Sequence, residues 1–186
     1  YNHLIGSNLQ LNILHFHLGV TGVYNYFNRL FKTYDDGYRK YNPRGFRFWN
    51  FSTDYGYYYR GASLCGELAS DGKGHLAFLN TLQYPLSDSF SLILSHRFYS
   101  YRYNAFYAKA FSEGSGVKNE SGFFAGGRYS PSYGFALSAF VDCFYFPWST
   151  YRTSSSSRGV DFCFQGEFSQ PGNQFSDMFS YRYKSR

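Results

Sequence analysis

Apolar and polar residues alternate along much of this chain, in stretches of about ten residues. The clearest stretch runs from Gly134 to Phe146. One set of alternate positions holds Phe135, Leu137, Ala139, Val141, Cys143 and Tyr145, and the other holds Ala136, Ser138 and Asp142, interrupted by Phe140 and Phe144. Because successive side chains of a β-strand point to opposite faces, this spacing predicts a strand with one apolar and one polar face.

The same alternation recurs over the remaining chain and predicts about ten strands. The expected strands cover Leu4–Leu14, His17–Phe27, Phe46–Tyr59, Ala62–Ala69, His75–Tyr84, Phe90–Tyr99, Glu120–Tyr129, Gly134–Phe146, Val160–Phe168 and Phe175–Lys184. The predicted fold class is all-β, with a single domain over residues 1–186 built as an up-and-down antiparallel sheet. No stretch of about 18 consecutive apolar residues occurs, so no transmembrane helix is expected.

The connections between the expected strands alternate between tight and long. Tight turns are expected at Arg60-Gly61, around Pro131 and around Pro171, and long polar loops at Asn28–Gly45, Ser100–Asn119 and Pro147–Gly159. Connections of one parity lie at one end of an up-and-down sheet, so the long loops share one rim. Outer-membrane barrels have this asymmetry, whereas a Greek-key sandwich has no reason for it. The pattern therefore predicts a transmembrane β-barrel of about ten strands, or a section of a larger barrel.

The composition suits a sheet that faces two solvents. Aromatic residues make up 24% of the chain and charged residues 16%, yet the mean hydropathy is −0.43. Abundant tyrosine, serine and glycine produce this combination, as in a barrel with one face in lipid and one in water. The net charge is +6, but the basic residues are scattered, many of them over the predicted loops, so nucleic acid is not an expected partner. No initiator methionine or signal peptide is present, so we expect a processed or incomplete chain.

Charged residues of the expected strands fall on positions that point inward. The candidate lumen-lining residues are Asp54, Glu67, Arg128, Asp142, Asp161, Glu167, Arg182 and Lys184. They fit a charged pore lining that sets selectivity, or a lumen closed by salt bridges, because a barrel of about ten strands leaves little open width. A section of a wider barrel would favour the open pore.

Aromatic residues gather at the ends of the expected strands rather than at their centres. The candidate membrane-interface residues are Trp49, Tyr57, Tyr58, Tyr84, Tyr99, Tyr129, Tyr145, Trp148, Tyr151 and Phe175. Tyrosine and tryptophan are enriched where strands cross the two membrane–water boundaries. This placement favours interfacial girdles over the alternative, a soluble aromatic core.

The search for catalytic chemistry finds one loose set of residues. His96, Asp142, Ser138 and Ser95 could in principle meet near a rim as a serine, histidine and acid set. The chain has no nucleophile-elbow motif, and serines are abundant throughout. We therefore expect no catalytic residues and no enzymatic activity.

Metal and cofactor chemistry is also not expected. His15 and His17 have the spacing that puts both on one strand face, without an evident third ligand, so a turn or interfacial role is favoured. Cys65, Cys143 and Cys163 are odd in number and widely spaced, which fits neither a disulfide framework nor a zinc site.

Three segments resemble known outer-membrane barrels. They are N-E-S-G-F-F-A-G (Asn119–Gly126), D-C-F-Y-F-P-W-S-T-Y-R (Asp142–Arg152) and G-V-D-F-C-F-Q (Gly159–Gln165). They are similar to barrel regions of helix-hairpin-helix domain-containing proteins from Bacteroidota, in which a small N-terminal domain precedes a large barrel. The likeness is best from about Leu82 to the end and weaker before that, and the helix-hairpin-helix part has no counterpart here. It implies an outer-membrane location but no reaction, and the ending Tyr181–Arg186 departs from the usual aromatic assembly signal.

Together these features predict a non-enzymatic integral outer-membrane β-barrel. It would act as a passive channel or as a scaffold subunit of an envelope complex. The expected partner is the lipid bilayer, and the candidate further partners are lipopolysaccharide, facing the loop cations, and other outer-membrane subunits. The alternatives are a lipid-modifying outer-membrane enzyme and a soluble lipocalin-like β-barrel binder.

Overall fold

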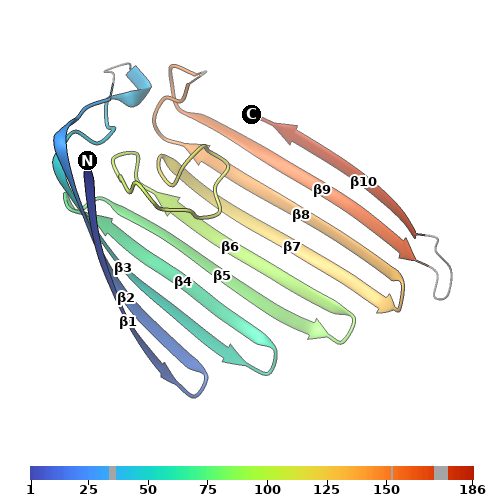
Figure 1. The fold of residues 1–186 in the computed structure, drawn as a ribbon. Coiled ribbons are helices and arrows are strands. Elements are labelled where there is room, and N and C mark those ends of the chain that lie inside the picture. Colours follow the sequence, from blue (N-terminus) through green and yellow to red (C-terminus); the bar gives the residue numbers. More distant parts are fainter. Residues whose placement is uncertain (34–36, 152, 170–175) are drawn as a thin grey trace.

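The computed structural model describes residues 1–33, 37–151, 153–169 and 176–186. They form one sheet of ten antiparallel strands, each paired with its neighbours in the sequence (Figure 1). The strands are β1 (Asn2–Ile13), β2 (Phe16–Phe31), β3 (Gly45–Tyr59), β4 (Ala62–Asp71), β5 (Leu76–Ser87), β6 (Phe90–Tyr99), β7 (Glu120–Ser132), β8 (Phe135–Phe146), β9 (Ser157–Ser169) and β10 (Ser176–Ser185). The predicted all-β, up-and-down architecture is confirmed.

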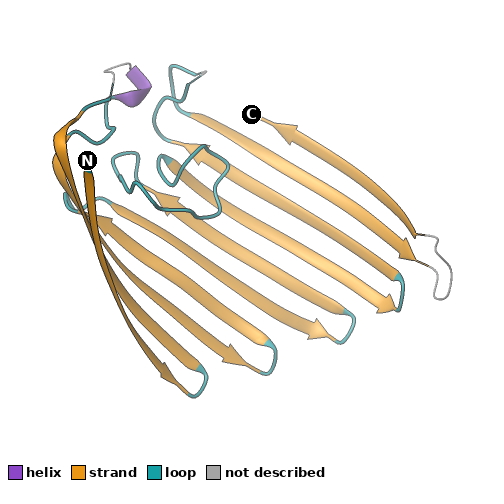
Figure 2. Ribbon diagram, viewed as in Figure 1, coloured by secondary structure: helices purple, strands orange, loops and turns teal. Residues whose placement is uncertain are grey.

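Strands account for nearly all of the regular structure, as Figure 2 shows. The described part of the chain has one helical element, the short 3-10 helix η1 (Gly37–Arg39). Within these residues, no helix is long and apolar enough to cross a membrane.

The sheet is curved into a trough and does not close on itself. In Figure 1 the concave face is turned toward the viewer, with β1 along one side and β10 along the other. The strand order places β1 and β10 at the two edges, and among the described residues neither has a second partner strand. We refer to the inside of this curve as the concave face and to the outside as the convex face.

Loop lengths sort between the two ends as predicted. Tight turns join β1 to β2, β3 to β4, β5 to β6 and β7 to β8, while the connections β2–β3, β6–β7 and β8–β9 are long. Arg60 and Gly61 both have positive φ (47° and 80°), the conformation of the two-residue turns that fit the twist of a β-hairpin. The turn expected around Pro171, together with Phe175, lies outside the described residues.

Two strands are longer than expected because proline does not end them. β5 continues through Pro85 and β7 through Pro131, where strand ends were predicted. The pairing register shifts at both places, between Pro85 and Ser87 and between Tyr129 and Ser132. Pro85 is itself paired with Ser91, and Leu86 after it is left out of the pairing, whereas Pro131 lies within its unpaired stretch. Proline is tolerated at and beside such irregularities, because the hydrogen-bond ladder is interrupted there.

The strand registers define the residues of each face, because directly paired residues point to the same side. One continuous row crosses seven strands on the concave face: Asn8, Thr21, Ser52, Ala69, Ala77, Tyr99 and Glu120. The adjacent row lies on the convex face: Leu9, Val20, Thr53, Leu68, Phe78, Phe98 and Ser121. The convex row is mostly apolar, and Leu9 in it is 75% exposed.

The small buried core lies on the concave face, beneath the β6–β7 connection. It consists of Ala77, Tyr99 and Tyr103, and Tyr103 belongs to the connection itself. Burial raises the pKa of Tyr103 to about 12. This part of the core is therefore buried because the connection covers it.

Candidate functional site

Residues 100–119, which we call the crossing loop, span the trough from one edge to the other. On the β1 side, Asn2 Nδ2 donates a hydrogen bond of 2.9 Å to the hydroxyl of Tyr107. On the β10 side, Lys184 Nζ pairs with the carboxylate of Glu113. Phe106 packs between these ends, with its ring 4.9 Å from that of Phe48 on β3. The loop therefore contacts both edges of an otherwise open sheet.

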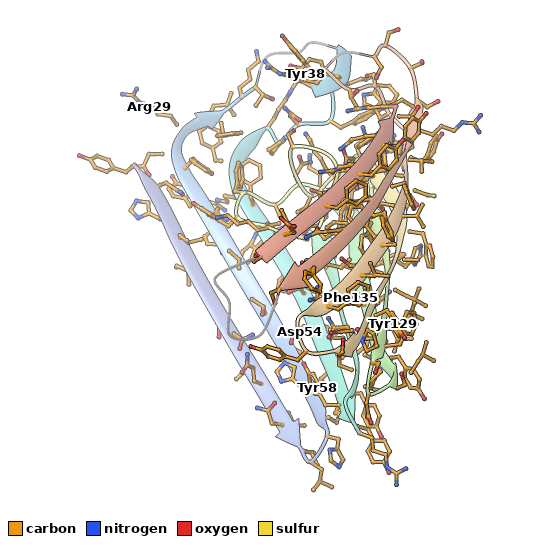
Figure 3. All side chains as sticks on the ribbon, turned by 90° about the vertical axis from the view of Figure 1, so that its right-hand side faces the viewer. Arg29, Tyr38, Asp54, Tyr58, Tyr129 and Phe135 are labelled. Carbon is orange, nitrogen blue, oxygen red and sulfur yellow. The ribbon has the colours of Figure 1, made fainter. Side chains whose placement is uncertain are left out.

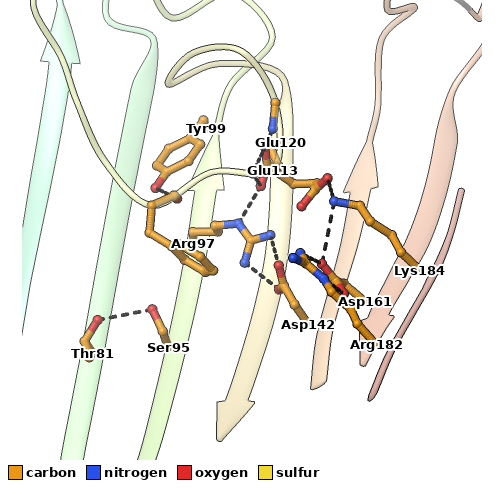
Figure 4. A network of polar contacts seen from close by, with 12 residues as sticks. Thr81, Ser95, Arg97, Tyr99, Glu113, Glu120, Asp142, Asp161, Arg182 and Lys184 are labelled. Atoms are coloured by element: carbon orange, nitrogen blue, oxygen red, sulfur yellow. Dashed lines mark hydrogen bonds and ion pairs between the residues drawn. The ribbon is translucent and has the colours of Figure 1, made fainter. Parts of the chain in front are cut away.

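A buried ionic cluster lies beneath the crossing loop (Figure 4). Arg97 on β6 is fully buried, and its Nε donates to Glu120 Oε1 at 2.5 Å. Its two terminal nitrogens donate to the two oxygens of Asp142 at 2.8 and 2.9 Å. This two-pronged geometry is the strong form of an arginine–carboxylate contact, and a buried arginine is tolerated only with such partners.

Gly122 makes room for the guanidinium group of Arg97. The two residues are directly paired across β6 and β7. A Cβ atom at Gly122 would lie 2.4 Å from Arg97 Cζ, far inside van der Waals contact. The glycine therefore allows the arginine side chain to lie flat over β7 and reach Asp142 on β8.

Glu120 links this cluster to the crossing loop. Its carboxylate accepts hydrogen bonds from the backbone N–H groups of Glu113, at 2.9 and 3.0 Å, and Gly114, at 2.8 Å. The guanidinium carbon of Arg97 also lies 4.7 Å from the ring centroid of Phe111. The cluster thus fixes the loop against the floor of the trough.

The charges continue onto the last two strands. Asp142 and Asp161 are directly paired across β8 and β9, an arrangement that is unfavourable for two carboxylates alone. Arg97 compensates Asp142, and Arg182 donates to Asp161 through Nε at 2.9 Å. Lys184 Nζ lies 3.6 Å from Asp161 as well. Alternating charges therefore extend from β6 to the edge at β10.

All of the predicted lumen-lining residues lie on the concave face according to the registers. The structure brings Asp142, Asp161, Arg182 and Lys184 together. Asp54 and Glu67 are paired with each other on β3 and β4, apart from this group; Figure 3 shows Asp54 from the β10 side. Nearer the turns, Arg128 and Glu167 form a half-exposed ion pair of 3.0 Å.

Sequence reasoning missed Arg97 and Glu120, the centre of the cluster. The alternation on β6 could have identified Arg97, because Ser95, Arg97 and Tyr99 occupy one set of alternate positions and Leu94 and Phe98 belong to the other. The role of Glu120 could not be read locally, because its partners lie on another strand and in the crossing loop.

Most of the predicted interface aromatics lie on the convex face. Trp49 and Tyr145 are near the loop end and Tyr57, Tyr84 and Tyr129 near the turn end, all of them exposed. Two further candidates differ. Tyr58 lies on the concave face, and Tyr99 is buried there, where its hydroxyl donates to the carbonyl of Phe111 at 2.8 Å.

Trp148 and Tyr151, also predicted for the interface, belong instead to a cap formed by the long loops. Trp148 Nε1 donates to the carbonyl of Gly37 at 3.3 Å, and its ring lies 4.9 Å from that of Tyr41. Tyr151 is 76% exposed, and its ring meets that of Tyr38 edge-on at 5.8 Å. Neither ring projects from a strand, because the chain leaves β8 at Phe146 and turns over the trough.

Asn119 holds two loops of this cap together. It has a left-handed backbone conformation (φ 57°) just before β7. Its side-chain amide donates to the carbonyl of Trp148 at 2.9 Å and accepts from the N–H of Trp148 at 2.8 Å. We call the joined loops, residues 37–44, 100–119 and 147–151, the loop cap.

Two cavities lie on the concave face, one on each side of the ionic cluster. Residues of β8 line both cavities. Toward the turns, Ser138 and Phe140 line a cavity of about 420 Å³, and under the loop cap Phe146 lines a cavity of about 990 Å³. Asp142, between them on the same strand, belongs to the ionic cluster. The ionic cluster around Arg97 therefore separates the two cavities along the trough.

The structure separates the residues considered for catalysis. His96 lies on the convex face, where its ring packs against Phe78, whereas Ser95, Ser138 and Asp142 are on the concave face. The serine, histidine and acid set that was considered near a rim, and not favoured, is therefore not assembled.

The histidine pair and the cysteines are also dispersed. His15 lies in the β1–β2 turn, with its ring edge-on to Tyr59, whereas His17 is on the concave face, 2.6 Å from Asp54. The favoured turn role is therefore confirmed for His15, and the two rings do not share a strand face because β1 ends at Ile13. Cys65, Cys143 and Cys163 are free thiols.

Comparison with known proteins gives no family. The chain matches no protein-family model, no curated protein and no solved structure. The resemblance to barrels of helix-hairpin-helix proteins stays a prediction, and function has to be argued from the two faces and the loop cap.

Proposed function

We propose that this chain forms the wall of an outer-membrane β-barrel and acts as a passive channel with a constricted lumen. The observation that carries the proposal is the reversed polarity of the sheet. Large apolar side chains are exposed along the convex face, among them Leu9 at 75% and Phe51 at 55%, while Arg97 is fully buried on the concave face. A soluble sheet buries its apolar face and exposes its polar one.

The exposed apolar side chains of the convex face would be favourable in contact with lipid. Soluble monomers rarely expose continuous apolar patches larger than a few hundred Å². Here the exposed apolar positions follow one face of every strand from β1 to β10, with aromatic residues near both ends. That is the pattern of a strand layer that crosses a bilayer, and it supports a lipid-facing convex surface.

The concave face supports a polar but narrow lumen. Its strands supply amides, hydroxyls and charges, which can line a water-filled path. The crossing loop and the Arg97 cluster lie across that path between the two cavities. A small polar solute would therefore pass only where the loop leaves space, which describes a passive pore of low conductance.

Planar-bilayer recordings of the purified protein test the channel. We expect small, ohmic conductance, and a several-fold increase when residues 103–117 are replaced by a short Gly-Ser linker. A matched control shortens the β8–β9 loop, residues 153–156, which does not cross the trough. Extraction of the protein into aqueous buffer without detergent would overturn the membrane assignment. Membrane insertion without conductance in either variant would overturn the channel.

The open edges favour a second candidate, a scaffold subunit of a larger assembly. Every residue of β1 and β10 is exposed, and their outer ladders are free within the described residues. Free strand edges pair with other strands, so β1 and β10 would pair either with each other or with further strands.

Cross-linking distinguishes these arrangements. In a cysteine-free background, Gln10→Cys on β1 and Ser180→Cys on β10 are treated with a short bifunctional maleimide. An intramolecular product supports a barrel closed by this chain and counts against the scaffold. Dimers, or a product with another polypeptide, support the scaffold.

A further inference from the structure

We propose that the cavity under the loop cap is a binding site for an anionic saccharide, a short sugar chain that carries phosphate or carboxylate groups. This proposal does not depend on the proposed channel, because the binding site requires only that the loop cap is folded. The cavity has a volume of about 990 Å³, at the upper end of the range for ligand pockets. It therefore holds more than a single small ion.

The aromatic residues of the cap suit a sugar. Tyr41, Tyr101 and Trp148 form a compact cluster in its wall, with the rings of Tyr101 and Trp148 stacked at 5.8 Å. Tyr38 and Tyr151 lie at the cavity as a second group, and Tyr151 is 76% exposed. An exposed tyrosine offers a flat apolar face for the C–H face of a sugar ring and a hydroxyl for hydrogen bonding.

Polar groups that can bond sugar hydroxyls line the same cavity. The side-chain amide of Asn104 donates to the carbonyl of Tyr41 at 3.0 Å, and Asn42 and Thr150 also line the cavity. Thr33 Oγ1 is buried at the same cavity, without a hydrogen-bond partner among the residues that the structure describes. Buried hydroxyls are normally bonded, so a ligand hydroxyl would complete this site.

Three cations line the cavity, and the partners of two of them, Lys118 and Arg186, point to a negative charge on the ligand. Lys118 Nζ donates to the neutral side-chain oxygen of Asn42, and Arg186 Nη2 donates to the neutral hydroxyl of Thr150 at 2.9 Å. Among the described lining residues the only carboxylate is that of Glu113, which pairs with Lys184. A phosphate or carboxylate would give these cations a charged partner.

The electrostatics of Lys118 agree with this placement. Burial, followed by the positive charge of nearby Arg39, lowers the pKa of Lys118. A bound anion would offset both effects, because it replaces the lost hydration and screens the neighbouring charge.

Binding is measured on the detergent-solubilised protein, so a negative result leaves the channel test untouched. The chain has two tryptophans, and Trp49→Phe leaves Trp148 as a fluorescent reporter inside the cap. The probes are the phosphorylated core oligosaccharide of lipopolysaccharide, freed of lipid, and trigalacturonate, a soluble acidic oligosaccharide. Maltotriose and inorganic phosphate serve as the neutral and the sugar-free controls.

We expect at least one acidic saccharide to change Trp148 fluorescence saturably, and to bind at least about tenfold more tightly than maltotriose or phosphate. Binding of the core oligosaccharide alone identifies a lipid of the same membrane as the source, and binding of trigalacturonate alone identifies a solute. Equal affinity for maltotriose overturns the anionic part of the proposal, and equal affinity for phosphate overturns the saccharide part.

Variants separate the cavity from general electrostatic attraction. Lys118→Met is expected to weaken binding about tenfold or more, the loss of one charge-assisted contact. The matched control is Arg29→Met, since Arg29 is an exposed loop-end cation that projects away from the cap (Figure 3). Equal loss in both variants overturns the site.

Tyr151 gives a second variant that does not depend on the fold of the cap, because its side chain is mostly exposed. Tyr151→Ala is expected to weaken saccharide binding several-fold, while Tyr151→Phe retains the stacking face and most of the affinity. Unchanged binding in Tyr151→Ala would remove the aromatic contact from the proposal and leave only an anion site.

Discussion

The convex and concave faces are built from alternate residues of the same ten strands, yet they follow opposite rules. On β3, Phe51 is 55% exposed on the convex side, while its neighbour Ser52 on the concave side is partly covered. Among the residues that the structure describes, none forms a layer over the apolar face, whereas the crossing loop covers part of the polar face. The two faces therefore suit different surroundings, the convex one apolar and the concave one polar.

The largest effect is expected where the concave face is broken at its ionic cluster. Arg97→Met leaves Glu120 and Asp142 buried without their shared cation, and we expect a loss of about 3–5 kcal/mol in unfolding free energy. Urea titration of the protein in detergent measures it. The triple variant Arg97→Met, Glu120→Gln, Asp142→Asn removes all three charges and should recover most of the loss. No recovery would mean that packing, not charge, holds the cluster.

Breaking the convex face is expected to have the next largest effect. Phe51→Arg places a charge at the middle of β3 on the exposed apolar side, at a cost of about 2–4 kcal/mol if that side faces lipid. Ser52→Arg puts the same side chain one residue away on the concave face, where a polar lumen tolerates it. Unfolding from lipid bilayers compares them, and equal stability of the two variants would contradict a lipid-facing convex surface.

A smaller effect is expected when the space for Arg97 on the concave face is reduced. Gly122→Ala puts a methyl group where the Arg97 guanidinium lies, so the arginine must move or the strands must shift, at about 1–3 kcal/mol. The control is Gly6→Ala on β1, where the nearest atom to a new Cβ is 3.7 Å away. Urea midpoints should fall for the first variant only.

The smallest expected effect concerns the pH dependence of the loop cap. Folding lowers the pKa of Lys118 below its ordinary 10.5, so the unfolded chain binds more protons between those two pKa values. Stability should therefore rise with pH through that window. Comparing urea midpoints at about pH 8 and about pH 10 measures the rise, which should be smaller in Lys118→Met. An unchanged pH slope in that variant would show that other groups cause it.

Local patterns predicted the sheet well, because strand alternation is a property of neighbouring residues. The bounds of β6 agree with the expected Phe90–Tyr99, and the three long loops fall at one end. Pro85 and Pro131 misled the prediction, since a proline usually ends a strand, and only the register shows that the pairing is irregular beside Pro85 and at Pro131.

The candidate site was less predictable because its contacts are distant in the sequence. The bond between Asn2 and Tyr107 joins residues 105 positions apart, and no pattern along the chain encodes it. Trp148 illustrates the same limit. An aromatic residue after a strand predicts an interface position, but the direction of its ring depends on Gly37 and Asn119 in other loops.

The crossing loop has a consequence for the width of the trough. Since it contacts β1 through Tyr107 and β10 through Glu113, its length measures the separation between the two edges. A shorter loop would draw the edges together and a longer one would let them move apart. Insertions and deletions in this single segment would thus change the width of the trough without altering the strands.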